Sequence, residues 1–301
     1  MFVIVGTGAL ASLFAARLAR CTSGPLWMLG TWAEAVAAIN TTGIVVETGS
    51  GAETVRVKAT ADPDQCSGAE AAIVLVKSWQ TGRAARQITS FLAPSGVALT
   101  LQNGLGNLET LGAELGVERT ALGITMQGAT LLGPGRVREG GRGPIHLADH
   151  PRLGSVVALL RDGGFEVHLA PDVTPLIWGK LVVNAAINAL TALLRVTNGE
   201  LLNRPSALAL ADEAAREVAA VAAAKNITLP FSDPVLRAHE VMRLTAHNRS
   251  SMLQDVLRNA PTEVEAINGA VVREAHVLNV STPVNEMLWR LVTALAQEHS
   301  T

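Results

Sequence analysis

The chain has 301 residues, 49% of them hydrophobic and 17% charged, with a formal net charge of −2 at pH 7. This length allows two domains with a sizeable core, and the balanced charge argues against a protein that binds nucleic acid or an acidic membrane surface. No run approaches the roughly 18–20 unbroken apolar residues of a membrane span. The opening "MFVIVGTGALA" has no export or transit pattern, so we expect a cytoplasmic protein.

Counts of three residue types narrow the chemistry. The two cysteines, Cys21 and Cys66, are far apart and lack metal-ligand spacing, which fits reduced cytoplasmic thiols. The chain has no tyrosine, so a catalytic Tyr–Lys pair of the short-chain dehydrogenase kind is excluded. The histidines show neither metal-ligand spacing nor a compelling His–Asp pairing of the kind found in hydroxyacid dehydrogenases, and we predict surface or core positions and no metal site. They are His146, His150, His168, His239, His247, His276 and His299.

The first 170 residues alternate between predicted strands and helices. A buried strand over 1–5, the turn "GTGALA" and a helix over 12–20 come first. Further strands are predicted over 25–29, 53–60, 71–77, 96–104, 120–129, 143–149 and 165–170, with helices between 77 and 96, over 108–116 and over 152–164. This alternation predicts an α/β domain with a doubly wound, Rossmann-type sheet over residues 1–170.

From residue 171 the pattern changes to helices alone. They are predicted over 172–196, 205–226, 233–248, 250–259, 262–279 and 284–299. Short polar segments rich in Asn, Gly and Pro separate them. We therefore predict an all-α C-terminal domain over residues 171–301.

The turn "GTGALA" carries the pattern of a dinucleotide site. Gly6 permits the tight turn, Gly8 lets a pyrophosphate approach the backbone, and Ala11 is small enough for close packing of helix on strand. The first turn of the following helix offers N–H donors and a positive dipole end to phosphates. An ordinary glycine-rich turn is the alternative, but the predicted strand before and helix after favour the dinucleotide.

The sequence after the second strand does not decide between NAD and NADP. An acid at this point favours NAD and an arginine favours NADP, but "MLGTWAEA" offers neither next to the strand. Thr31 is a candidate donor to a 2′-phosphate, and Trp32 a candidate for packing on adenine. Arg17 and Arg20, on the preceding helix, are expected to face solvent.

Polar residues end two neighbouring predicted strands. Lys77 ends one strand, and Gln102 and Asn103 end the next. In open α/β sheets ligands bind beyond the carboxyl ends of the strands, so these side chains are expected near nicotinamide and substrate. A solvated charge is the alternative for Lys77, and a common Asn-Gly turn is the alternative for Asn103.

A lysine and two amides share one stripe of the apolar helix "WGKLVVNAAINAL". Lys180, Asn184 and Asn188 follow at steps of four, which stacks their side chains on one helix face. Taken alone, Lys180 also fits a lysine whose stem packs on the core and whose amine reaches water. The asparagines also fit hydrogen bonds between core helices.

Five stretches in this order resemble the ketopantoate reductase (2-dehydropantoate 2-reductase) family over essentially the whole chain: "GTGALA", "VKSWQT", "LQNGLGN", "WGKLVVNAAINALTAL" and "SSMLQDVLRNAPTEVEAINGAVV". The resemblance implies reduction of 2-dehydropantoate with NADPH on the route to pantothenate and coenzyme A, with NADH still open. It also implies a Rossmann domain followed by a helical domain like the C-terminal domain of 6-phosphogluconate dehydrogenase, with the active site in the cleft between them.

The resemblance also assigns roles to individual residues. Lys180 matches the general acid, and Asn184 and Asn188 match active-site amides. A lysine ammonium can hold a carbonyl oxygen, stabilise developing negative charge and release a proton, and partial burial lowers its pKa toward neutrality. Asn103 completes the predicted catalytic set with Lys180 and Glu263. The predicted cofactor-binding residues are Gly6, Thr7, Gly8, Ala9, Leu10, Thr31, Lys77, Gln80 and Asn103.

The last motif supplies two further candidates for substrate binding. Ser251 has a hydroxyl suited to a carboxylate, and a helix N-cap with Gln254 is its alternative role. Glu263 lies just after Pro261 in an expected first helical turn, where it also suits the helix dipole. By resemblance Glu263 holds the distal hydroxyl of the substrate and helps to orient the lysine. Glu265 is given no role.

Three hypotheses follow. The first is ketopantoate reductase, and the second is a related lysine-dependent reductase of another 2-oxo acid. The third is a nucleotide-binding regulator without chemistry, which the presence of Lys180, Asn184, Ser251 and Glu263 argues against. The expected partner is a small 2-oxo acid, and a homodimer is compatible with the sequence.

Overall fold

Residues 2–5 form an inner strand of the first unit because their side chains alternate between two apolar layers. In β1 (Phe2–Val5), Ile4 belongs to the core on one face of the sheet, and Val3 and Val5 to the core on the other. β1 pairs in parallel with β2 (Leu26–Leu29) and with β6 (Ala69–Val74). The strand order therefore reverses at β1, and such a switch point is where open α/β sheets bind ligands.

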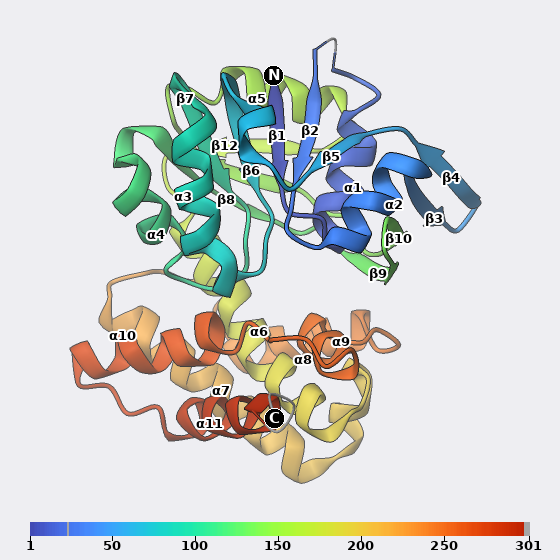
Figure 1. The fold of residues 1–301 in the computed structure, drawn as a ribbon. Helices are drawn as coiled ribbons and strands as arrows, with labels where there is room; N and C mark the ends of the chain where they lie inside the picture. Colours follow the sequence, from blue (N-terminus) through green and yellow to red (C-terminus); the bar gives the residue numbers. More distant parts are fainter. Residues whose placement is uncertain (23, 298–301) are drawn as a thin grey trace. The chain divides into compact units, whose positions relative to one another are not determined.

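The eight-stranded sheet has the order β12-β11-β8-β7-β6-β1-β2-β5, and β8 with β11 is its antiparallel pair. Figure 1 shows β1 between β2 and β6. Its other strands are β5 (Lys58–Thr60), β7 (Leu92–Thr100), β8 (Thr120–Thr125), β11 (Ile145–Ala148) and β12 (Val167–Ala170). The helices are α1 (Ala9–Leu18), α2 (Ala33–Thr41), α3 (Thr81–Phe91), α4 (Asn107–Leu115) and α5 (Gly154–Asp162). Helices α1 and α5 belong to one core layer and α3 and α4 to the other, as the predicted doubly wound fold requires.

A second sheet of four strands was not predicted. Its order is β4-β3-β10-β9, with β3 (Ile44–Thr48), β4 (Gly51–Val55), β9 (Ala129–Gly133) and β10 (Arg136–Glu139). The prediction of one strand over 53–60 is therefore wrong, because Val55 pairs with Ile44 in the small sheet while Lys58 pairs with Trp27 in the large one. The predicted strand over 120–129 is divided between the two sheets in the same way.

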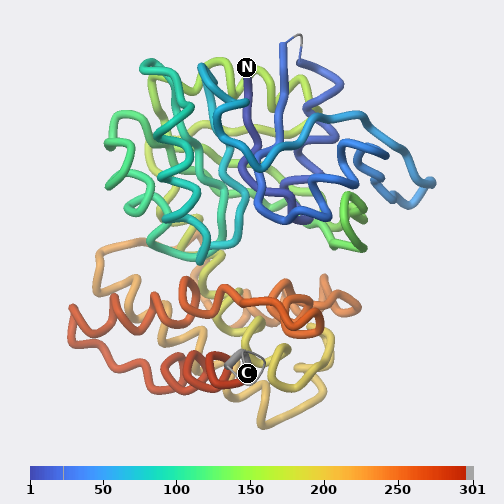
Figure 2. Tube along the Cα trace, viewed as in Figure 1, coloured from blue at the N-terminus to red at the C-terminus, as the bar shows by residue number. Residues whose placement is uncertain are grey.

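The second unit consists of helices packed around one apolar core, coloured yellow to red along the tube of Figure 2. Its α-helices are α6 (Thr174–Leu194), α7 (Pro205–Ala224), α8 (Pro234–Leu244), α9 (Ser251–Leu257), α10 (Ala270–Leu278) and α11 (Pro283–Gln297). Residues 198–203, expected as a loop, form the 3₁₀-helix η4 (Asn198–Asn203). The structure describes residues 1–22 and 24–297, so the last two residues of the predicted helix over 284–299 lie outside it.

The predicted helix over 262–279 begins differently from the prediction. Its first part is a π-helix, η5 (Glu265–Gly269), and α10 follows directly. The Gly269 N–H donates to the Val264 carbonyl oxygen at 3.0 Å, a spacing of five residues rather than four. Such short π segments occur frequently at functional sites.

The two compact units of the structure are not separated by a single cut in the sequence. The first unit comprises Met1–Gln102 and Asn107–Val173, and the second begins at Thr174 but also contains Asn103–Gly106. This segment groups with the helices because the Leu105 N–H donates to the Ala266 carbonyl oxygen at 2.9 Å.

Helix α6 is long and apolar enough to cross a membrane by length and composition, which the sequence analysis did not anticipate. In its most apolar window 67% of the residues are buried inside the protein. That burial is typical of the central helix of a helical core, and α6 contributes residues from Trp178 to Ala192 to this core.

Candidate active site

The glycine turn after β1 has the geometry that a dinucleotide phosphate requires. Gly6 has φ +132°, which strains any side-chain-bearing residue, and a Cβ there would crowd the Leu75 carbonyl oxygen at 3.1 Å. At Gly8, which precedes α1, a Cβ would meet no atom within 4 Å, and no side chain caps this helix start. The first N–H groups of α1 therefore have no capping side chain among the described residues, and the turn fits a nucleotide pyrophosphate.

Two other residues of this pattern, Thr7 and Ala11, pack the turn against its neighbours. Thr7 is buried, and a Cβ at Gly30 would lie 2.5 Å from its methyl group, so the turn packs directly on the end of β2. Ala11 is fully buried in the core beneath α1, where the pattern requires a small residue. Ala9 and Leu10 begin α1 and remain partly exposed.

The Gln102 side chain joins the ends of β6 and β7. The sequence analysis placed Gln102 at a strand end but did not predict this contact. The Gln102 amide donates to the Val76 carbonyl oxygen at 2.9 Å and to the Thr81 hydroxyl at 2.8 Å. Lys77 follows Val76 and is half-buried, and its carbonyl accepts from the Gln80 N–H at 2.8 Å. Lys77 and Gln80 are thus held next to the switch point, and only the position of Gln102 at a strand end signals this contact.

The region after β2 differs from the expectation in one respect. Thr31 is exposed and Trp32 precedes α2, as a site for the adenosine end would require. The expectation that Arg17 faces solvent is wrong: it forms a hydrogen-bonded ion pair with Glu139 and lies over the Phe165 ring. The cause is the small sheet, whose strand β10 brings Glu139 against α1.

Arg20, by contrast, is exposed. It pairs with Glu53 at 2.7 Å on the surface. Such a surface pair contributes little to stability and leaves the guanidinium accessible.

Lys180 on α6 is half-buried as a residue, and burial lowers the pKa of its amine to about 8. The negative charge of Glu263 acts in the opposite direction and raises that pKa. Glu263 is itself only 5% exposed. An amine with this pKa is still mostly protonated at pH 7 and is a stronger acid than an ordinary lysine.

Among the described residues, the side-chain amides of Asn184 and Asn188 lack the hydrogen-bond partners that polar groups in a protein core usually have. Asn184 is half-buried and Asn188 is 7% exposed. Within the described part of the chain neither side-chain amide makes a hydrogen bond, although the Asn188 carbonyl accepts one from the Thr191 hydroxyl at 3.0 Å. Their donors and acceptors therefore remain available to a ligand.

The start of α9 lies against the same helix. The Ser250 hydroxyl accepts from the Leu253 N–H at 3.0 Å and lies 2.7 Å from the Thr191 hydroxyl of α6. The alternative role of Ser251 as N-cap is therefore wrong, because Ser250 is the cap and Gln254 donates instead to the Arg249 carbonyl. Because Ser250 is the cap, the half-buried Ser251 hydroxyl is not used for capping.

Glu263 lies at a bend before η5 rather than in a first α-helical turn. Its carbonyl oxygen accepts from the Ala266 and Ile267 N–H groups, both at 3.1 Å. The segment that carries Asn103 contacts this same turn, and a Cβ at Gly104 would lie only 2.3 Å from the Ala266 carbonyl oxygen. The structure therefore places Asn103 in the same unit as Lys180 and Glu263.

The histidines include one pair that the sequence analysis missed. His239 on α8 contacts Asp212 on α7 at 2.7 Å, and neither residue belongs to the set predicted for the site. The two residues come from separate helices, and no local spacing reveals them. Among the described residues, no three histidine, cysteine or acidic side chains gather as a metal site would require.

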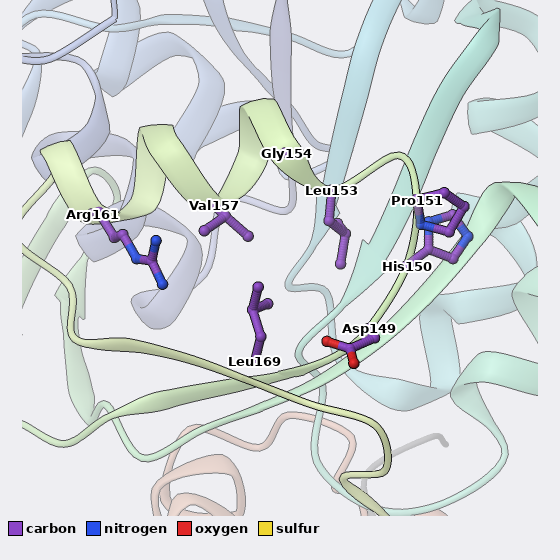
Figure 3. Close-up of a pocket in the computed structure, with 8 residues that line it drawn as sticks. All are labelled: Asp149, His150, Pro151, Leu153, Gly154, Val157, Arg161 and Leu169. Atoms are coloured by element: carbon purple, nitrogen blue, oxygen red, sulfur yellow. The ribbon is translucent and has the colours of Figure 1, made fainter.

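A cavity of about 640 Å³ lies elsewhere in the first unit (Figure 3). It lies between α5 and β12, with Leu153, Val157 and Leu169 between Asp149 at one end and Arg161 at the other. It contains none of the residues predicted for the site. We therefore treat it as separate from the candidate active site.

A Rossmann-type unit with an open glycine turn, joined to a helical unit that carries a buried amine, defines the class: a nicotinamide-dependent oxidoreductase. Residues 2–152 match the family described as "Ketopantoate reductase PanE/ApbA", and residues 172–296 match "Ketopantoate reductase PanE/ApbA C terminal". The chain belongs to the ketopantoate reductase family.

Individual relatives agree with this membership. The 2-dehydropantoate 2-reductase of Halobacterium salinarum is 34% identical over 96% of this chain and 97% of its own. A crystal structure of a PanE/ApbA family ketopantoate reductase from Ralstonia eutropha JMP134 superposes with a TM-score of 0.92, at 30% identity over 100% of both chains. The complex of D-mandelate dehydrogenase with NADH has a TM-score of 0.89, at 25% identity over 99% of both chains. The protein is thus an oxidoreductase of the kind that reduces a small keto acid.

Proposed function

We propose that this protein reduces 2-dehydropantoate to (R)-pantoate with NADPH, as a step toward pantothenate and coenzyme A. The observation that carries the proposal is the Lys180 amine, whose pKa burial lowers to about 8 beside the buried Glu263 carboxylate. It lies on one stripe of α6 with two amides that have unused hydrogen-bonding capacity. A nucleotide-binding regulator has no need of such a proton donor.

The cofactor is assigned to the first unit and to the segment that carries Asn103. Gly6, Thr7, Gly8, Ala9 and Leu10 would hold the pyrophosphate at the start of α1. Thr31, Lys77, Gln80 and Asn103 would contact the remainder of the nucleotide. When bound, the nicotinamide supplies a hydride to the carbonyl carbon of the substrate.

Lys180 acts on the carbonyl oxygen. Its ammonium donates a hydrogen bond to that oxygen, stabilises the negative charge that develops there, and transfers a proton to complete the alcohol. The neutral amine then takes up a proton from water before the next turnover. The Asn184 and Asn188 amides, which keep free donors and acceptors within the described part of the chain, would hydrogen-bond to the bound substrate without adding a second carboxylate near the lysine.

Ser251 and Glu263 recognise the two ends of the substrate. The Ser251 hydroxyl, which capping leaves unused, would donate to the substrate carboxylate. The Glu263 carboxylate would accept a hydrogen bond from the distal hydroxyl of 2-dehydropantoate. A buried acceptor of this kind discriminates against an analogue that lacks the hydroxyl, because its hydrogen bond is then unmade.

Initial rates test this proposal. We expect kcat/KM for 2-dehydropantoate to exceed that for 2-oxoisovalerate, which lacks the distal hydroxyl, and NADPH to support faster turnover than NADH. Equal rates with the two keto acids would contradict the substrate assignment. Faster turnover with NADH would contradict the cofactor assignment while leaving the reaction intact.

A second candidate is a reductase of another 2-oxo acid on the same plan. The likeness to D-mandelate dehydrogenase favours it, because that protein acts on an aryl hydroxy acid and has the same two-part fold. Phenylglyoxylate, the 2-oxo acid that corresponds to mandelate, separates the two. Preference for it over 2-dehydropantoate would replace the first proposal with the second.

A further inference from the structure

The π-helix η5 is held on its buried side by the Asn268 amide, and on its exposed side Glu265 accepts from the Trp289 indole N–H of α11 at 2.7 Å. Asn268 is fully buried, and its Nδ2 donates to the Asn285 Oδ1 at 2.9 Å and to the Ala185 carbonyl oxygen at 3.3 Å. Ala185 directly follows Asn184 on α6. Asn268 thus joins the turn after Glu263 to the helix that carries Lys180.

The orientation of Asn285 is determined by its other contacts. Its Nδ2 donates to the Glu217 carboxylate at 2.7 Å and to the Ala214 carbonyl oxygen at 3.1 Å. Both N–H bonds of this amide are therefore used, and its Oδ1 must face Asn268. The Asn285 amide consequently cannot rotate by half a turn without losing three hydrogen bonds.

Glu217 on α7 is the other end of this chain of contacts. It is 9% exposed and accepts from the backbone N–H groups of Val284 and Asn285, both at 2.8 Å. These N–H groups belong to the first turn of α11. The N–H groups of a first turn have no acceptor within their own helix, and the positive end of the helix dipole favours a negative charge there. Among the described residues no cation pairs with Glu217, so these N–H donors are what stabilises the buried carboxylate.

On its opposite side η5 supports the candidate site. The Glu263 carbonyl accepts from Ala266 and Ile267, and the Ala266 carbonyl accepts from Leu105. The backbone path of this turn therefore determines the positions of Glu263 and of the segment that carries Asn103. A π-helix is rarer and intrinsically less favourable than an α-helix, so an external anchor is required to hold it.

We propose that Asn268, Asn285 and Glu217 form a buried positioning relay that holds η5 against α6 and so fixes Glu263 and Asn103 relative to Lys180. The inference rests on the proposed function and adds three positioning residues to it. They act on the substrate only through the residues that they place. A misplacement of about 1 Å at such a site can cost on the order of 10²-fold in rate.

Asn268→Ala tests the relay against Val271→Ala. Val271 is also fully buried and lies on α10 just after η5, but contributes only apolar packing. We expect Asn268→Ala to raise KM for 2-dehydropantoate and lower kcat, each about tenfold. We also expect it to move the basic limb of the pH profile to lower pH, the direction expected when the Glu263 charge no longer acts on Lys180. Val271→Ala should lose stability with these values unchanged. Equal kinetic behaviour of the two variants would overturn the relay.

The far end of the relay gives a second test. Glu217→Gln keeps the side-chain volume but removes one acceptor oxygen, and should reproduce the kinetic pattern more weakly. Combined with Asn268→Ala it should add nothing to the loss of the single variant, because both act through η5. Additive losses would mean two unrelated sites and would overturn the relay.

Amide hydrogen exchange tests the relay without substrate. We expect Asn268→Ala to speed exchange over residues 263–269 and 103–106 more than over α7, whereas Val271→Ala speeds exchange more evenly. If Asn268→Ala left the exchange of residues 263–269 unchanged, the relay would be contradicted, whatever the activity of that variant. If the wild-type enzyme reduces no 2-oxo acid, the proposed function fails, and hydrogen exchange still decides whether the relay exists.

Discussion

At the scale of single residues, the chemistry depends on the proton of Lys180. Burial lowers the pKa of this amine to about 8, and the charge of Glu263 prevents it from falling further. Below that pH the amine carries the proton that the reaction needs, and above it the proton is lost. We therefore expect kcat/KM for keto-acid reduction to fall as the pH rises through about 8. Steady-state rates between pH 6 and pH 10 measure this, and a profile flat to pH 10 would contradict it.

Glu263 has two effects that one substitution separates. Glu263→Gln removes the charge that raises the Lys180 pKa, so the basic limb should move to lower pH. It also weakens the contact with the substrate hydroxyl, so KM for 2-dehydropantoate should rise about tenfold or more. KM for 2-oxoisovalerate serves as the control, because that substrate has no such hydroxyl. A parallel rise for both substrates would argue against the hydroxyl contact.

The candidate residues were predicted from local patterns and from the family resemblance. The spacing of Lys180, Asn184 and Asn188 follows from the period of one helix. The environment of Lys180 does not, because Glu263 comes from a distant part of the chain. The choice between Ser250 and Ser251 as the cap of α9 also escaped prediction, since both fit the local consensus and the Thr191 hydroxyl on α6 contacts Ser250.

At the scale of elements, the segment 103–106 depends on its close approach to η5. Gly104 and Gly106 both have positive φ, +80° and +87°, so alanine strains the backbone similarly at either position. Only at Gly104 would the new Cβ meet the Ala266 carbonyl, at 2.3 Å, whereas at Gly106 it would meet nothing within 4 Å. We expect Gly104→Ala to lower kcat at least tenfold more than Gly106→Ala, in steady-state assays at saturating NADPH. Equal losses would show that only backbone strain matters.

The elements themselves were predicted where apolar periodicity is strong. The strand–turn–helix at the start of the chain and the long helix α6 follow from such patterns. The small sheet was missed because membership of a sheet depends on pairing partners, and continuous segments such as 53–60 and 120–129 are shared between two sheets. The π-helix was missed because one extra residue per turn, over five residues, barely disturbs an apolar pattern.

At the scale of the whole molecule, the two units carry different candidate residues, and of the predicted cofactor residues Asn103 lies in the second unit. The first holds the glycine turn and Thr31, and the second holds Lys180 and Glu263. Cofactor choice should therefore change independently of substrate binding. We expect Thr31→Arg, at an exposed position after β2, to raise the ratio of kcat/KM for NADPH to that for NADH about tenfold, with KM for the keto acid unchanged. An unchanged ratio would mean that the nucleotide is read elsewhere.

The most direct test of the account is kcat for Lys180→Ala with 2-dehydropantoate at saturating NADPH. NADPH affinity, followed by fluorescence titration, is the control and should stay within about twofold, because Lys180 lies outside the predicted nucleotide site. General acid catalysis is typically worth about 10²–10⁴-fold, so the account predicts a loss of kcat in that range or greater. Near-normal turnover by a folded, NADPH-binding Lys180→Ala protein would remove the lysine from the mechanism.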